Sequence, residues 1–294
     1  MKRLALFIMV SMFFGFGTSF AQSDPNWEGE ITTNITSMQD MKTAVKTKNI
    51  LAKMILKNVM KKIENNGYYT GTYTSTTIVK GKNRYKVFTP YNNSYMIVEK
   101  NGDMMKTTTY FPGIKKGYYT TTSLSANKQQ MEDLRKGKIE KTGETMTICG
   151  RKCEVYRVKY EVKVDSAGTK STTTMNNDYA IFQDPTEDEV LPGIKGSPLK
   201  YINNTVSQST NDMLDMDYKM YLASETVSIK DRAVDESEVT VPGEIKLIDA
   251  DKNQKGMLKI IEENMKYLKK NKMWNEKSAD EIKIYDNLQE DWEY

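Results

Sequence analysis

Cys-Glu-Val-Tyr-Arg-Val-Lys-Tyr-Glu-Val-Lys-Val, residues 153–164, is the stretch that decides the fold class. From Tyr156 to Val164 every second side chain is apolar or aromatic, and the side chains between them are charged. Successive side chains of a strand point to opposite faces of a sheet, so the pattern predicts a strand with one buried and one solvated face. Burial on one face only is typical of antiparallel sheets.

A second stretch, Leu214–Leu222, alternates in the same way. Its apolar positions are Leu214, Met216, Tyr218, Met220 and Leu222. Other runs rich in Thr, Tyr and Val are separated by short turns, and Asn101-Gly102 is a typical hairpin turn. These further strands are expected at Trp27–Ile35, Tyr68–Val79, Arg84–Thr89, Tyr95–Lys100, Met104–Phe111, Glu144–Cys149, Thr173–Phe182, Glu225–Ile229 and Glu238–Val241. Successive strands joined by short turns predict an antiparallel meander.

A helix is expected over Met41–Glu64. Apolar residues recur on one face at Val45, Leu51, Met54, Ile55, Val59 and Ile63, and the opposite face is rich in lysine. Two interpretations stay open for this helix: it packs on the sheet with its lysines solvated, or it lies on an anionic membrane. A shorter helical stretch is expected over Ser123–Lys136.

The end of the chain is predicted to be helical. Met257–Met273 has an apolar stripe, and Ser278-Ala279-Asp280-Glu281 is a capping box that would open a last helix. Residues 251–294 are therefore expected to form a helical C-terminal extension of a β domain that spans residues 22–250.

The first 21 residues have the pattern of a cleavable signal peptide. Lys2 and Arg3 precede the apolar stretch Leu4–Phe16, and the small residues Ser19 and Ala21 precede a cleavage site at Gln22. The protein is therefore expected to be periplasmic, or secreted and associated with the outer membrane, in a Gram-negative envelope. No later segment is apolar enough to predict a transmembrane span.

The amino-acid composition excludes several classes of catalytic and metal-binding site. The sequence contains no histidine, which removes Ser-His-Asp and Cys-His nucleophile systems and most zinc, copper and non-haem iron sites. We find no glycine-rich phosphate loop and no specific catalytic motif. The basic residues are almost all lysine, which gives no sign of nucleic-acid binding. We therefore expect a protein that is not an enzyme and has no cofactor or metal. An enzyme that works through carboxylates, Lys, Tyr or a Ser-Lys pair is the alternative that stays open.

Cys149 and Cys153 are the two cysteines of the chain. A hairpin loop over Gly150-Arg151-Lys152 would place them opposite each other, and an oxidising compartment would favour a disulfide. Free thiols, and redox or metal chemistry, stay open as alternatives. The carboxylates Asp212, Asp215 and Asp217 are interpreted as a solvated face rather than as a calcium site.

Several short motifs resemble a known group of families. They are Trp27-Glu28-Gly29-Glu30-Ile31, Val79–Lys86, Tyr95–Asp103, Tyr110–Tyr119, Ile148–Tyr156, Leu191-Pro192-Gly193, Pro198–Tyr201 and Val239–Gly243. In this order they resemble uncharacterised secreted bacterial families, domains of unknown function, with a fold similar to LolA and LolB, the outer-membrane lipoprotein carriers. The resemblance covers about residues 25–247. Val239, Glu244 and Cys149 stand where those families usually have Phe, Tyr and a small residue.

The resemblance implies an α+β fold in which a strongly curved antiparallel sheet, an unclosed barrel, wraps around helices. It also implies an apolar concave face that holds acyl chains. We therefore expect a non-catalytic envelope module that binds a lipid, a lipoprotein acyl chain or another apolar ligand. Its predicted wall residues are Tyr156, Val158, Tyr160, Met216, Tyr218 and Met220.

The alternative is a structural or protein-interaction module of the envelope that has no small-molecule ligand. In that case the C-terminal helices or the helix over 41–64 would dock a protein partner. Peripheral contact with a membrane is compatible with both hypotheses.

Overall fold

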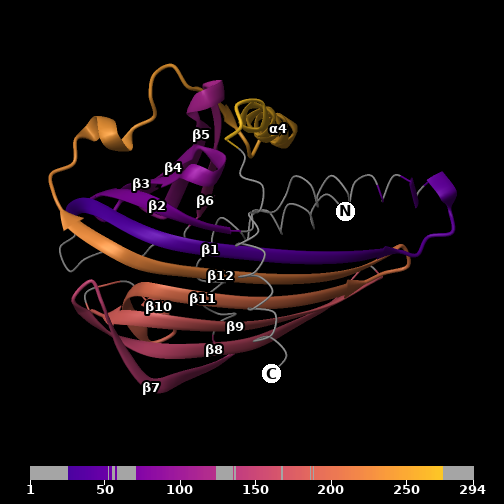
Figure 1. Ribbon diagram of the computed structural model, residues 1–294, viewed down its shortest axis with the longest axis horizontal. Coiled ribbons are helices and arrows are strands. Elements are labelled where there is room, and N and C mark those ends of the chain that lie inside the picture. Colours follow the sequence, from indigo (N-terminus) through magenta and orange to yellow (C-terminus); the bar gives the residue numbers. More distant parts are fainter. Residues whose placement is uncertain are drawn as a thin grey trace.

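The computed structural model describes residues 26–51, 53–54, 57, 71–123, 135, 137–166, 168–185, 187 and 189–273. In this part of the chain thirteen strands form one large, unclosed, mixed sheet (Figure 1). The strands are β1 (Glu28–Val45), β2 (Gly71–Lys80), β3 (Arg84–Thr89), β4 (Ser94–Asn101), β5 (Met104–Phe111), β6 (Lys116–Ser123), β7 (Lys138–Ile148), β8 (Arg151–Ser166), β9 (Thr169–Gln183), β10 (Glu189–Leu191), β11 (Ile194–Thr210), β12 (Leu214–Asp231) and β13 (Lys246–Asp249).

The strand order shows how the sheet is assembled. It runs β13-β6-β5-β4-β3-β2-β1-β12-β11-β9-β8-β7, and β10 pairs with β11. Every pair is antiparallel except β13 with β6. The predicted meander is present in β2–β6 and in β7–β9. The pairing of β1 with β12 joins the two halves of the sheet, although these strands lie far apart in the sequence.

The long strands β1, β12, β11, β9 and β8 run side by side and curve together, as Figure 1 shows. Their register shifts at Thr32/Thr33 in β1 and at Pro198/Lys200 in β11. A β-bulge bends its strand and increases the local twist, so these positions contribute to the curvature. The ends of the strand order, β13 and β7, do not pair with each other among the described residues, and the sheet stays unclosed.

The helical part of the predicted fold class needs correction. Most of the described chain is sheet, and α4 (Gln254–Lys270) is the one full-length helix in it, so this is not the helix-rich α+β fold that we expected. Residues 41–45 of the predicted 41–64 helix belong to β1, because they pair with β12 along the whole strand. Residues 50, 51, 53, 54 and 57 are helical, and the rest of that segment lies outside the described residues.

Two other predicted helices are tested only in part. Ser123 ends β6 and Arg135 is helical, but most of the 123–136 stretch lies outside the described residues. The predicted helix at 257–273 corresponds to α4, whereas the one that begins at Ser278 also lies outside the described residues.

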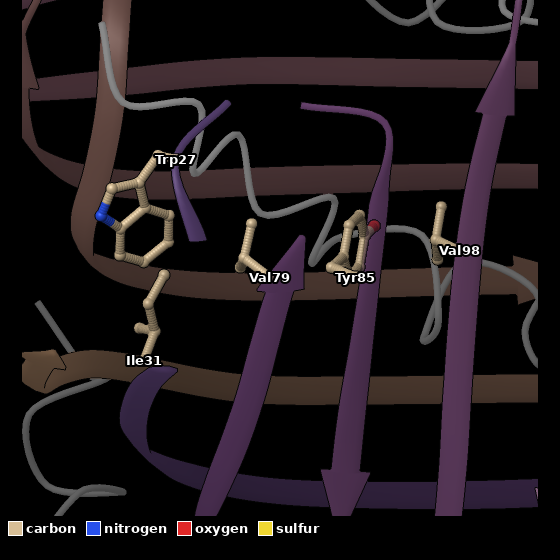
Figure 2. Packing of buried hydrophobic residues seen from close by; sticks show 5 residues of the cluster. All are labelled: Trp27, Ile31, Val79, Tyr85 and Val98. Atoms are coloured by element: carbon tan, nitrogen blue, oxygen red, sulfur yellow. The ribbon is translucent and has the colours of Figure 1, made fainter. Parts of the chain in front are cut away.

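Buried apolar side chains form clusters on the sheet. Figure 2 shows Trp27, Ile31, Val79, Tyr85 and Val98, which come from β1–β4 and from the residue before β1. Tyr156, Val158, Ile181 and Leu191 form a second cluster on β8–β10. Complete burial of one such side chain contributes about 1.5–3 kcal/mol, so these clusters stabilise both halves of the sheet.

The expected strand at Glu238–Val241 is wrong. Glu236–Val239 forms the 3-10 helix η3, and the side chains of Asp235 and Glu238 make a reciprocal capping box. Glu238 also accepts two hydrogen bonds from the Arg232 guanidinium, at 3.0 and 2.8 Å. With Val239 fully buried, the segment is fixed by its own cap and by packing, without a partner strand.

Helix α4 packs against the turns at one end of β3–β6. These turns contain the 3-10 helices η1 (Pro90–Asn92) and η2 (Pro112–Ile114). Asn264 donates a hydrogen bond to the Asn92 carbonyl at 2.9 Å, and Lys116 pairs with Glu263 at 2.6 Å. The buried face of α4, with Ile260 and Leu268, therefore packs on its own chain.

Candidate functional site

The six predicted wall residues share one face of the sheet. Tyr160 on β8 is linked through Met175 on β9 and Thr205 on β11 to Met220 on β12, because these residues are register partners in successive pairs. Tyr156 lies four positions before Tyr160, and Met216 four positions before Met220. Side chains an even number of positions apart point to the same face of a strand, so the structure places all six on that face.

The two groups of three do not touch each other across the sheet. Strands β9 and β11 lie between β8 and β12, and three strand spacings amount to about 14 Å. The side chains that fill this gap are Met175, Asn177 and Tyr179 on β9, and Tyr201, Asn203 and Thr205 on β11. We call these six, together with the six predicted residues, the tyrosine face.

A hydrogen-bond network occupies the centre of the tyrosine face. The buried Asn203 amide nitrogen donates to Asn177 Oδ1 at 2.8 Å and to the Tyr201 hydroxyl at 2.9 Å. Its oxygen accepts a hydrogen bond from the Thr205 hydroxyl at 2.8 Å. Asn177 in turn donates to the Tyr179 hydroxyl at 3.5 Å. The amide groups therefore satisfy each other, which buried polar groups require.

The tyrosines add aromatic surface without adding charge. The Tyr179 and Tyr201 rings are in contact, with centroids 4.8 Å apart. Burial raises the pKa of both hydroxyls above the usual value. Burial, and the hydrogen bond that Tyr156 donates to Glu154, raise the pKa of Tyr156 to about 12. These hydroxyls stay protonated and neutral near pH 7, so the tyrosine face is an uncharged aromatic surface with a polar centre.

This set of groups limits the chemistry of the site. Neutral tyrosines, amides, a threonine hydroxyl and thioethers can bind apolar surface and donate hydrogen bonds, but they include no general base poised near pH 7. Among the described residues, no group of three acidic or cysteine side chains could hold a metal ion. Asp215 pairs with Lys46, and the hydrogen bonds from Lys46 and Thr210 lower the pKa of Asp215.

Sequence reasoning missed half of the tyrosine face. Strand β11 was not predicted, because Gly196 and Pro198 interrupt it and its run Asn203-Asn204-Thr205 has no apolar alternation. Asn177 fell in a predicted strand, but its polar side chain gave no sign of burial. The every-second-residue spacing of Tyr201, Asn203 and Thr205 is the signal that was available.

The two cysteines do not face each other as predicted. Cys149 and Gly150 form the turn between β7 and β8 with φ values of +48° and +75°, and the register pairs Cys153 with Met146. Positive φ at both central residues is the pattern of a two-residue hairpin turn, one that leaves Cys149 at its tip. Both thiols are free in the structure, Cys149 exposed and Cys153 buried. The predicted cross-strand placement is therefore wrong, and the disulfide itself stays a prediction.

None of the helices in the described part of the chain has the length and apolar character needed to cross a membrane.

No protein-family model matches the sequence, and no curated protein is significantly similar to it. The LolA and LolB resemblance thus stays an expectation from short motifs.

Proposed function

We propose that the protein is an exported, non-catalytic module of a bacterial envelope that binds a lipid, a lipoprotein acyl chain or another apolar ligand. The observation that carries the proposal is the shared position of the six wall residues on one face of a curved, unclosed sheet. Tyr, Met and Val side chains suit an acyl chain, because flexible thioethers and flat rings adapt to apolar ligands. The neutral hydroxyls and amides at the centre suit a ligand that carries polar atoms.

Native mass spectrometry of the protein purified without detergent tests the ligand directly. We expect an added mass that solvent extraction recovers as lipid. A bare polypeptide mass, with no uptake when lipids are offered, would contradict the proposal and favour the protein-interaction alternative. Cell fractionation with N-terminal sequencing tests export and cleavage before Gln22.

Two neighbouring residues of β8 provide a matched pair of variants. Tyr160 lies on the tyrosine face, and Lys159 is exposed on the opposite face. Tyr160→Lys places a charge on the binding face and should abolish lipid uptake, since an unpaired charge is costly against apolar groups. Lys159→Tyr should leave uptake unchanged. Equal uptake by both variants would place the ligand elsewhere.

A further inference from the structure

The chain leaves the sheet after β1 and forms a short helical segment beyond the ends of the long strands, at the right of Figure 1. The Lys53 amide donates to the Asn49 carbonyl at 2.9 Å, which is the spacing of an α-helical turn. The Lys46 amide donates to the Met213 carbonyl at 2.9 Å, so the β11–β12 turn lies beside the residue at which the chain leaves β1 for this segment. We call the described residues of 46–57 together with Met213 the tip.

Large apolar side chains of the tip are exposed to solvent. Ile50 is 77% exposed, Leu51 68% and Met54 59%, and Met213 in the β11–β12 turn is also exposed. Ile50 and Met54 lie one turn apart on the helical segment, with Leu51 adjacent, so the three form a contiguous apolar patch. Of the two interpretations that the sequence leaves open for this segment, packing on the sheet does not hold for Leu51 and Met54, because both side chains are exposed. Contiguous exposed apolar surface marks an interaction site.

Lysines surround this patch. Lys48, Lys53 and Lys57 are exposed, and within the described residues none of them forms an ion pair. Lys46 differs, because it pairs with Asp215 and donates a hydrogen bond to Thr210. Lysine side chains can extend their ammonium groups to the level of lipid phosphates while their apolar stems lie along buried surface.

We propose that the tip docks on an anionic lipid bilayer, with Ile50, Leu51 and Met54 inserted at the headgroup boundary. The exposed side chains of Lys48, Lys53 and Lys57 would lie at the level of the phosphates. Apolar side chains bordered by lysine are the pattern of interfacial membrane contact, whereas protein–protein interfaces are depleted of lysine. The proposal is independent of the ligand on the tyrosine face, since the two surfaces share no residue.

Vesicle co-sedimentation tests this contact. The probes are vesicles of phosphatidylcholine alone and vesicles of phosphatidylcholine mixed with phosphatidylglycerol. The protein and its variants are purified after export, so that all share the same N-terminus. We expect the wild type to sediment with the mixed vesicles only, and added salt to release it.

The double variant Ile50→Ser/Leu51→Ser should lose at least about tenfold in affinity for the mixed vesicles, because it removes most of the inserted apolar surface. Lys48→Glu and Lys53→Glu should each lose about fivefold or more, since one basic residue near an anionic surface contributes about that factor. The matched control is Leu258→Ser/Lys259→Glu on α4, where the exposed Leu258 also neighbours a lysine. The control should bind like the wild type.

A second measurement places the side chain at the bilayer. In Leu51→Trp the new fluorescence should shift to the blue with mixed vesicles and be quenched by brominated acyl chains. The proposal is wrong if the wild type does not sediment with the anionic vesicles. It is also wrong if Ile50→Ser/Leu51→Ser sediments with them to the same extent as the wild type. A wild-type dimer that this double variant converts to a monomer in light scattering, without vesicle binding, would instead make the tip a self-association surface.

Discussion

The buried amide of Asn203 offers the sharpest test of the tyrosine face. Asn203→Ala removes two donated hydrogen bonds and one accepted hydrogen bond, and it leaves Asn177 Oδ1 and the Thr205 hydroxyl without these partners. A net contribution of about 1 kcal/mol per hydrogen bond, with a further penalty for each buried group left unpaired, predicts a loss of about 2–4 kcal/mol in the free energy of unfolding.

Urea unfolding followed by circular dichroism measures this loss as a lower midpoint at an unchanged slope. The matched control is Asn176→Ala, because Asn176 is the neighbour of Asn177 on β9 and is exposed on the opposite face. Its effect should stay within about 0.5 kcal/mol. Asn177→Ala should destabilise by about 1–2 kcal/mol, because it loses the bond to Asn203 and the longer one to Tyr179.

The double variant Asn177→Ala/Asn203→Ala should cost about 1 kcal/mol less than the sum of the single variants, since both remove the same bond. If Asn203→Ala unfolds at the same urea concentration as Asn176→Ala, the network does not stabilise the fold, and the reasoning is refuted.

Three other predictions follow from contacts elsewhere in the fold. Hydrogen bonds from an arginine and from a backbone amide lower the pKa of Glu238 to about 2, so its stabilisation is complete above the ordinary value of 4.5 and is lost as the pH falls toward 2. Glu238→Gln should flatten the pH dependence of the melting temperature in that range, and an unchanged slope would contradict this. A Cβ at Gly113 would lie 2.3 Å from the Tyr267 ring, so Gly113→Ala should destabilise by about 1–3 kcal/mol, and by clearly less when Tyr267 is also Ala. Although Cys149 is exposed as a residue, its thiol donates to the Thr226 carbonyl, and partial desolvation there raises the pKa of this thiol. Burial raises the pKa of Cys153 to about 11. A chromogenic disulfide reagent should therefore modify Cys149 slowly at pH 7 and faster at higher pH, and Cys153 only in denaturant; rapid reaction of both native thiols would argue against the burial of Cys153.

Local sequence patterns predicted the elements whose signals lie within the element. Strand β3 (Arg84–Thr89) and strand β5 (Met104–Phe111) have the predicted bounds. The predicted hairpin between β4 and β5 is also present, but its two turn residues are Gly102, at φ +57°, and Asp103, because Asn101 still pairs with Met104. The prediction failed where pairing overrode local preference. Residues 41–45 begin the segment in which the spacing of apolar residues predicts a helix. They extend β1 instead, because β12 pairs with them as far as Leu214, the first residue of β12.

The amino-acid sequence by itself determined which side chains alternate, and so which residues of β8 and of β12 share a face. The absence of histidine was equally visible, and with it the absence of any catalytic or metal site built on histidine in this sequence. Only the tertiary structure decided what lies between those strands, because β9 pairs with β11 past the short β10 segment and β12 pairs with β1, which is distant in the sequence. That pairing buries Asn177 and Asn203 between the tyrosines. The tertiary structure also decided that Ile50 and Leu51 lie beyond the ends of the strands, since an apolar side chain is buried only where another part of the chain covers it.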